Sequence, residues 1–155
     1  MISLLFDMNK LWEEFVFVEI KKALLGSEFV VRGQDIRPFI GHNFLKPDIT
    51  ITHNSDPRRV YVIDTKWKQP KGRSAAISDL RQMYAYSRFW NAKKTILLYP
   101  GESLSEGFND YQTEDYFLGS NAGRFFNIVI RHRSFVPFSD CYVCENIWSF
   151  EHDWL

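Results

Sequence analysis

Apolar side chains recur at helical spacing through the first 25 residues of the chain. One stripe with intervals of three or four comprises Leu4, Met8, Leu11, Phe15 and Val18, and it is widened by Leu5, Trp12 and Val16. This spacing predicts a single amphipathic helix from about Ser3 to Leu25, with the stripe turned toward a core. Gly26 can leave the helical conformation without steric penalty, so it is the expected stop.

The next segment has a weaker pattern. Glu28–Arg32 is rich in β-forming residues and is predicted as a strand. Arg37-Pro38 and Gly41 interrupt any periodicity after it, so this stretch is predicted as a polar link.

Two strong strand signals then follow each other closely. Ile49–Thr52 alternates apolar and polar residues, and Val60–Ile63 is a continuous apolar run typical of a central strand. The turn residues Asn54–Pro57 join them. We therefore expect an antiparallel pair in which the start of the first strand lies beside the end of the second.

A second helical pattern covers Ala75–Trp90, with Ser74 or Ser78 as its N-cap. Lys94–Tyr99 reads as a buried strand, and a strand, helix, strand order implies a parallel crossover onto the same sheet. Two further strands are expected, a weak one at Tyr116–Leu118 and a better one at Phe125–Arg131. The pattern as a whole predicts an α/β fold.

Composition fits a single globular domain over residues 1–155. Apolar residues make up 45% and charged residues 25%, while the 17% aromatic content predicts a core rich in rings. The amino terminus lacks the features of a signal peptide, and no apolar run approaches the ~20 residues of a membrane span. Cys141 and Cys144 lack a second ligand pair for zinc. We expect a cytoplasmic protein with reduced thiols.

Net charge is zero, but its distribution is uneven. Arg58–Arg73 holds six basic residues and one acid, whereas 101–115 and 134–155 hold acids without a single lysine or arginine. Local positive potential favours a polyanion, with Lys68, Lys71 and Arg73 as candidate DNA contacts. On charge alone, a solvated loop is an equally good interpretation.

The candidate chemistry lies at the ends of the predicted strand pair. Asp48 opens the first strand and Asp64 closes the second, so the antiparallel arrangement brings both carboxylates to one edge. Lys66 lies two residues after Asp64 and projects to the same face. Hydrolysis of a phosphodiester with Mg²⁺ needs such oxygen ligands and a cation, and the carbonyl of Thr65 could add a ligand. The alternative is an ordinary surface pair of Asp and Lys.

Side chains from the two helices could complete this site. Gln82 and Tyr86 are four residues apart and share one helical face. In the first helix Glu13, Glu14 and Glu19 are all candidates for a helix-borne acid, and the pattern does not select one of them.

Pro47-Asp48 together with Asp64-Thr65-Lys66 resembles the PD-(D/E)xK nuclease superfamily, and Gln82 with Tyr86 resembles its QxxxY element. Five blocks in order are similar to the nuclease region of McrC, the cleavage subunit of McrBC-type restriction systems that target modified cytosine. They are Phe6–Val16, Lys46–Ile49, Val62–Lys68, Ser78–Tyr86 and Leu97–Pro100. The resemblance implies a restriction-endonuclease-like mixed sheet flanked by helices, with an αβββαβ core.

The resemblance also implies roles for individual residues. Asp48 and Asp64 would bind Mg²⁺, with Mn²⁺ as a substitute, Lys66 would be the catalytic lysine, and Gln82 and Tyr86 would be accessory contacts. Glu13 takes the family's acidic helix position. The implied activity is cleavage of DNA coupled to a separate McrB-like AAA+ GTPase motor. The amino-terminal region by which McrC engages that motor is not expected in this chain.

Two other functions fit the same residues. The domain could be a catalytically idle interaction module of a restriction complex, or a nuclease of the same fold in DNA repair or recombination. Cleavage of both strands would require two active sites, and therefore a dimer or two complexes that meet on DNA.

Overall fold

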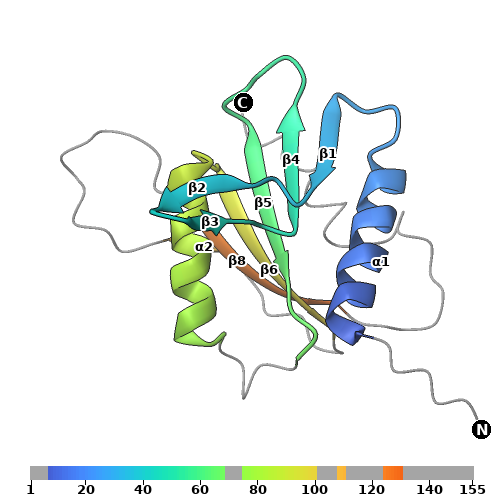
Figure 1. The fold of residues 1–155 in the computed structure, drawn as a ribbon. Helices are drawn as coiled ribbons and strands as arrows, with labels where there is room; N and C mark the ends of the chain where they lie inside the picture. The colour runs from blue at the N-terminus through green and yellow to red at the C-terminus, as the bar shows by residue number, and fades with distance from the viewer. Residues whose placement is uncertain (1–6, 69–74, 101–107, 111–123, 131–155) are drawn as a thin grey trace, which may run out of the picture.

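A mixed six-stranded sheet forms the centre of the chain, with strand order β1-β4-β5-β6-β8-β7 (Figure 1). The computed structural model describes residues 7–68, 75–100, 108–110 and 124–130. The sheet contains β1 (Phe29–Gly33), β4 (Ile49–His53), β5 (Val60–Thr65), β6 (Lys94–Pro100), β7 (Phe108–Asp110) and β8 (Arg124–Ile130). The helices are α1 (Met8–Ala23) and α2 (Ile77–Phe89), and a separate hairpin comprises β2 (Arg37–Ile40) and β3 (Asn43–Leu45).

In the sheet, strands joined by a short turn run antiparallel, and strands joined through a helix run parallel. β1, β4 and β5 are antiparallel neighbours, whereas β5, β6 and β8 are parallel, with α2 as the crossover from β5 to β6. These directions confirm the predicted strand pair and the parallel crossover. Within the six-stranded sheet they also confirm the order of helix, three strands, helix and strand, and the β2–β3 hairpin is inserted between β1 and β4. The predicted strand at Tyr116–Leu118 lies outside the described residues, as do Cys141 and Cys144.

Helix α1 begins later than its apolar stripe suggested. The side chain of Asp7 accepts hydrogen bonds from the backbone N–H groups of Asn9 and Lys10, at 3.0 and 3.4 Å, and so caps the first turn at Met8. Gly26 adopts a φ of +82° just after the helix, which confirms the expected stop.

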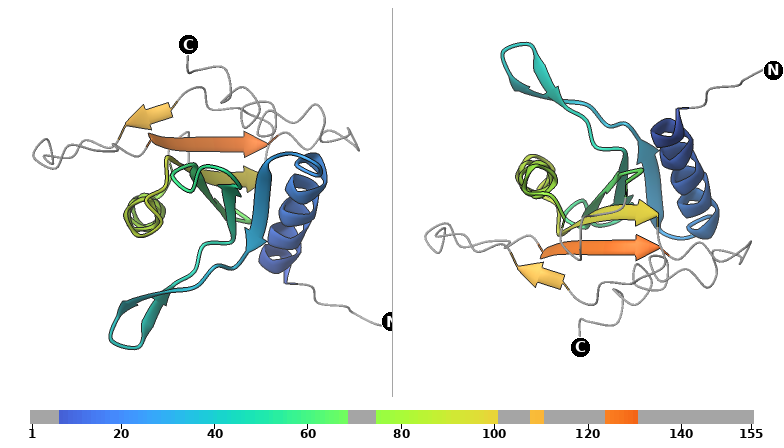
Figure 2. Two further views of the ribbon diagram at one scale, coloured as in Figure 1. Left: turned by 90° about the horizontal axis from the view of Figure 1, so that it is seen from above. Right: turned by 90° about the horizontal axis from the view of Figure 1, so that it is seen from below.

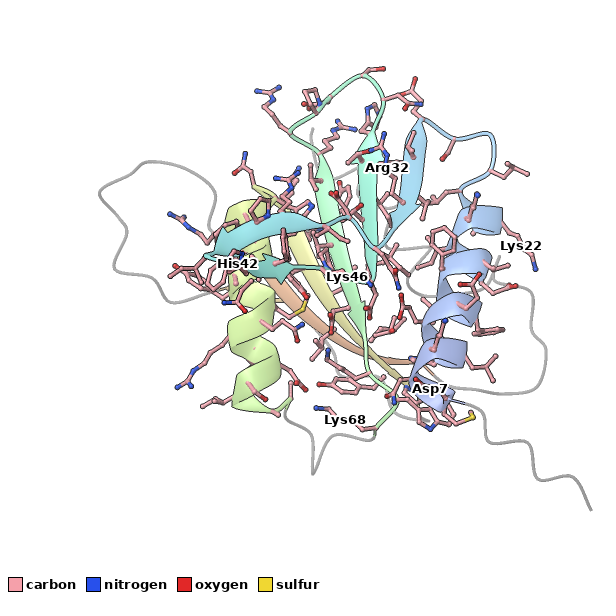
Figure 3. The ribbon with its side chains drawn as sticks, in the orientation of Figure 1. Asp7, Lys22, Arg32, His42, Lys46 and Lys68 are labelled. Carbon is pink, nitrogen blue, oxygen red and sulfur yellow. The ribbon has the colours of Figure 1, made fainter. Side chains whose placement is uncertain are left out.

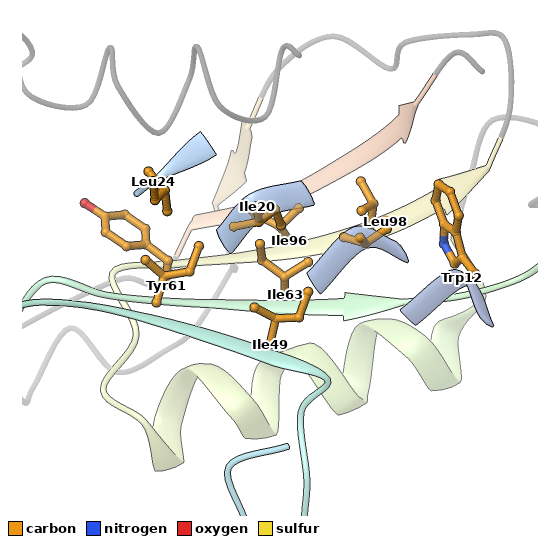
Figure 4. Packing of buried hydrophobic residues seen from close by; sticks show 10 residues of the cluster. Trp12, Ile20, Leu24, Ile49, Tyr61, Ile63, Ile96 and Leu98 are labelled. Carbon is orange, nitrogen blue, oxygen red and sulfur yellow. The ribbon is translucent and has the colours of Figure 1, made fainter. Parts of the chain in front are cut away.

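The face of α1 that packs on the sheet overlaps the predicted stripe but is not centred on it. The buried residues are Trp12, Val16 and Ile20, and the first two were predicted at the edge of the stripe. The residues predicted at its centre are 36 to 51% exposed in the described helix, namely Met8, Leu11, Phe15 and Val18. Both sets recur at helical spacing. The structure selects the row spaced by four, because this row contacts Ile49, Tyr61, Ile63, Ile96 and Leu98 of the sheet (Figure 4).

The two helices cover opposite faces of the sheet (Figure 2). Alternate residues of β5 divide between them: Tyr61 and Ile63 pack with α1, and Val60 and Val62 pack with α2. The same alternation continues past Ile63, so the even-numbered Asp64 is on the side of α2. Neither helix in the described part of the chain is both long enough and apolar enough to cross a membrane.

Two local predictions were wrong. The expected polar link after β1 is the β2–β3 hairpin, whose two-residue turn places Gly41 at a φ of +57°, a conformation that favours glycine. Helix α2 has Ala76 as its N-cap, without a side-chain capping hydrogen bond, and Ser78 lies inside the helix. Ser74 lies outside the described residues.

Candidate active site

The antiparallel register of β4 and β5 brings the two predicted carboxylates together. Ile49 is opposite Ile63, so one further step of the ladder places Asp48 opposite Asp64. Both lie on the α2 side of the sheet. Asp48 is half-buried, whereas Asp64 is only 1% exposed.

Thr65 holds the Asp48 carboxylate. Both its backbone N–H and its hydroxyl donate to Asp48 Oδ2, at 2.6 and 2.9 Å. The carbonyl oxygen of Asp48 is also bound, because the N–H of Gln34 donates to it at 2.9 Å. Asp48 is thus fixed at its main chain and at one oxygen, while no hydrogen bond from a described residue occupies its Oδ1. Sequence reasoning assigned Thr65 only a carbonyl contact to metal and missed this bond.

Asp64 is the carboxyl of the site whose pKa is raised most strongly. Burial, and then the negative charge of Asp48, raise the pKa of the Asp64 carboxyl to about 6, against the opposing effect of Lys66. The Lys66 ammonium contacts Asp64 Oδ2, yet no described donor makes a well-directed hydrogen bond to that buried oxygen. Asp64 therefore carries a negative charge in a place that only partly compensates it.

Lys66 belongs to a chain of polar contacts that crosses to α2. Its ammonium donates to Gln82 Oε1 at 3.2 Å, Gln82 Nε2 donates to the Tyr86 hydroxyl at 2.7 Å, and that hydroxyl donates to the carbonyl of Lys46 at 3.0 Å. Burial, and then the charge of Asp64, raise the pKa of Tyr86, so this phenol stays protonated. The structure thus brings all of the predicted α2 residues to Lys66.

The structure distinguishes the three candidate acids of α1. Glu13 Oε1 accepts a hydrogen bond from Gln34 Nε2 at 2.8 Å, and Gln34 is the residue whose N–H binds Asp48. Glu19 instead forms an ion pair with Lys22 at 2.7 Å, and Glu14 is exposed. Of the three acids, Glu13 is therefore the one that Gln34 connects to the main chain of Asp48.

Sequence reasoning missed Gln34 as well. Its φ of +52° is uncommon for a residue with a side chain, and it turns the N–H toward Asp48 while the amide reaches α1. Nothing in the local sequence predicts that conformation.

The predicted concentration of positive charge around the carboxylates is only partly correct. Arg58 and Arg59 pair with Asp56 at the start of β5, at 3.1 and 3.7 Å, roughly 17 Å of strand away from Asp64. They belong to the other end of the sheet. Lys68 lies near the site but pairs with Asp79 at 2.6 Å (Figure 3). Lys71 and Arg73 lie outside the described residues.

Asp79 on α2 holds the residues that follow β5 in place through its contact with Lys68. This buried carboxylate accepts from Lys68 Nζ and, at 3.1 Å, from the hydroxyl of Tyr99 in β6. Burial raises the pKa of Asp79, but the hydrogen bonds from Lys68 and Tyr99 outweigh it and hold the pKa below its ordinary value. Asp79 therefore ties α2, β6 and the residues after Lys66 together.

Asp79→Asn is expected to lower the free energy of unfolding at neutral pH by about 1 kcal/mol, since Lys68 is half-exposed and its pairing is screened. Because the folded-state pKa is depressed, this stabilisation is present above the ordinary pKa of 3.8 and is lost as the pH falls through the lower folded value. Denaturant unfolding from about pH 3 to pH 8 measures it. Ser78→Ala, an exposed neighbour on α2, is the control and should show no such pH dependence.

The donor set suits a hard divalent cation. The described residues include no group of three or more His, Cys, Asp or Glu that could hold a metal ion, so a cation here would have the two carboxylates and complete its shell with carbonyl oxygen or water. Mg²⁺ is commonly bound through one or two carboxylates with several waters retained. The buried Asp64 Oδ2 without a directed donor is the observation that favours a bound cation.

A mixed sheet with a helix on each face, and two aspartates and a lysine where β4 begins and β5 ends, define a domain of the restriction-endonuclease-like class. The chain belongs to the McrBC family: residues 1–100 match the model described as McrBC 5-methylcytosine restriction system component.

One solved structure with this fold is the half-complex from a tetradecameric assembly of Thermococcus gammatolerans McrB AAA+ hexamers with bound McrC. It matches at a TM-score of 0.64 with 19% sequence identity, over 93% of this chain and 32% of that chain. At this identity the likeness shows the fold alone, and this chain spans 32% of the length of that relative. No curated protein sequence matches the chain.

Proposed function

We propose that this domain is a divalent-metal-dependent DNA endonuclease, the cleavage component of a modification-dependent McrBC-type restriction system. The observation that carries the proposal is the juxtaposition of Asp48, Asp64 and Lys66. Asp64 is almost fully buried, its pKa is raised, and among the described residues its charged partner is the lysine two residues later. Perturbed acids of this kind concentrate at functional sites.

Each of these residues would have a distinct task. Asp48 and Asp64 would hold Mg²⁺, and a bound Mg²⁺ would polarise the scissile phosphate and lower the pKa of a coordinated water. Lys66 would stabilise negative charge that develops on the phosphate, because its ammonium already lies at the carboxylate edge. Gln82 would orient Lys66, and Tyr86 would orient Gln82. Glu13, through Gln34, would supply the helix-borne acid.

A motor partner is part of the proposal. The similar solved structure contains McrB AAA+ hexamers with bound McrC, and this chain corresponds to 32% of its relative there. We propose that an McrB-like GTPase selects the modified site and delivers DNA to this domain. Two copies or two complexes would be required for cleavage of both strands.

The test is a plasmid nicking assay on the purified chain with Mg²⁺, Mn²⁺ or EDTA, alongside calorimetric titration with Mn²⁺. We expect nicking that depends on the divalent ion, and metal binding that is lost in Asp48→Ala. Glu13→Gln should reduce nicking more than Glu19→Gln, because Gln34 connects Glu13 to the main chain of Asp48, whereas Glu19 pairs with Lys22. Absence of both metal binding and nicking would contradict the proposal and favour the idle interaction module.

A further inference from the structure

The β2–β3 hairpin is an exposed element that the proposed chemistry does not use. Every residue of its two strands is exposed except the half-buried Leu45, and it projects from the body of the domain (Figure 2). Large apolar side chains on it face solvent: Ile40 is 66% exposed and Phe44 is 62% exposed. Exposed apolar side chains of this size on a projecting hairpin indicate a binding surface.

The base of the hairpin is fastened to the last turn of α2. The Arg37 guanidinium donates to the carbonyl of Phe89 at 2.5 Å and lies 4.6 Å from the centre of the Trp90 ring. Trp90 Nε1 in turn donates to Asp35 Oδ2 at 2.6 Å. These contacts fix the direction of the hairpin while its tip remains uncovered by any described residue.

The same helix also fixes the catalytic end of the sheet. Gln82, Tyr86 and Trp90 are spaced by four and form one ridge of α2. Gln82 contacts Lys66, and Tyr86 contacts the carbonyl of Lys46. Trp90 contacts Asp35 at the base of the hairpin. The hairpin therefore has a defined position relative to Lys66 and the carboxylates.

The charge of the hairpin matches a polyanion. From Ile36 to Pro47 the sequence contains Arg37, His42 and Lys46 and no acid, and Arg37 lies 4.0 Å from Asp35 at the base of the hairpin. Lys46 is exposed at the end of the hairpin, two residues before Asp48, and His42 lies at the turn (Figure 3). Apolar side chains flanked by positive charge are what DNA-bending proteins insert between base steps from the minor groove.

We propose that the β2–β3 hairpin holds duplex DNA beside the carboxylate pair, with Ile40 and Phe44 against the bases of the groove and Lys46 on the backbone. This inference rests on the proposed nuclease function. A protein partner is the competing occupant, but it gives no reason for the exposed Lys46 at the end of a hairpin that leads directly into Asp48.

The experiment measures binding of the full chain to a short labelled DNA duplex by fluorescence anisotropy, with Ca²⁺ in place of Mg²⁺. The double variant Ile40→Ser/Phe44→Ser should bind the duplex about tenfold more weakly, because it loses the apolar contacts with the bases of the groove. Lys46→Gln should reduce the slope of log affinity against log salt by about 1. The substituted side chains are exposed, so circular dichroism should show an unchanged fold.

Leu25→Ser is the matched control, because Leu25 is 84% exposed just after α1, which covers the face of the sheet opposite α2, and this variant should bind DNA like the wild type. Equal DNA affinity of the hairpin variant and the wild type would overturn the hairpin inference while leaving the nuclease proposal intact. A change in solution mass with unchanged DNA affinity would assign the hairpin to a protein partner. A wild-type chain that binds no duplex but cuts in the presence of Mg²⁺ would also overturn the inference alone, whereas neither binding nor cutting would overturn both.

Discussion

Asp64→Asn is expected to abolish DNA cleavage, with a loss of at least about a thousandfold in rate. Asn keeps the shape of the side chain but removes the charge that would hold the cation. Asp64 is the buried member of the pair, and no other described carboxylate could replace it beside Asp48. Initial rates of plasmid nicking at saturating Mg²⁺, with calorimetric titration of Mn²⁺, provide the measurement.

The same variant should fold at least as stably as the wild type when metal is absent. A carboxyl whose folded-state pKa is raised to about 6 stabilises the fold below its ordinary pKa of 3.8, and this contribution is lost as the pH rises through 6. At neutral pH and in EDTA, Asn removes that unfavourable ionisation. Denaturant unfolding should therefore give an unchanged or higher free energy of unfolding, with a smaller dependence on pH between about 4 and 6.

Asp56→Asn serves as the control for cleavage, because Asp56 lies at the other end of β5, where it pairs with Arg58 and Arg59. It should cut DNA at the wild-type rate. If Asp64→Asn retained full nicking activity, the assignment of the carboxylate pair would be wrong. If the Asp64→Asn variant failed to fold, Asp64 would be required for the stability of the fold, and the loss of cleavage would not support a role in metal binding.

The position of the carboxylate pair could be predicted because it depends only on the direction of two neighbouring strands and on the alternation of side chains along them. A tight turn after β4 forces an antiparallel pair, and a period of two then fixes both the edge and the face on which Asp48 and Asp64 meet. The spacing of Gln82 and Tyr86 on α2 is equally local. What the sequence could not supply was Thr65 as the donor to Asp48, since strand periodicity says nothing about which backbone N–H a carboxylate will reach.

Other features could not be predicted for two reasons. In α1 two apolar rows fit the same helical spacing, and the count of basic residues along the sequence took no account of their separation in space. Helix α1 carries two apolar rows, and only the sheet decides that Trp12, Val16 and Ile20 are buried. The count of basic residues assumed that all those from Arg58 to Arg73 lie close together, although the length of β5 separates Arg59 from Asp64. The hairpin had a usable signal, a Gly-X turn between apolar residues at Ile40 and Phe44, but its exposed strands lack a hydrophobic period.

Lys66→Ala is expected to lower the cleavage rate by about a hundredfold to a thousandfold while leaving metal binding intact. Asp48 and Asp64 keep their oxygens in this variant, whereas the cation that would stabilise the phosphate charge is gone. Removal of Lys66 also leaves Asp64 without its charged partner, so Mn²⁺ affinity should be equal to or higher than that of the wild type. Nicking rates at saturating Mg²⁺ and calorimetry with Mn²⁺ separate the two effects.

Gln82→Ala tests whether the polar chain acts through Lys66. It should reduce the rate less than Lys66→Ala does, and the double variant should be no slower than Lys66→Ala alone, because Gln82 has no further task once the ammonium is absent. Lys22→Ala, an exposed lysine paired with Glu19 on α1, is the matched control and should cut like the wild type. If the two substitutions lowered the cleavage rate additively, Gln82 would contact the substrate itself. If Lys66→Ala lost Mn²⁺ binding, the lysine would position the carboxylates and not the phosphate.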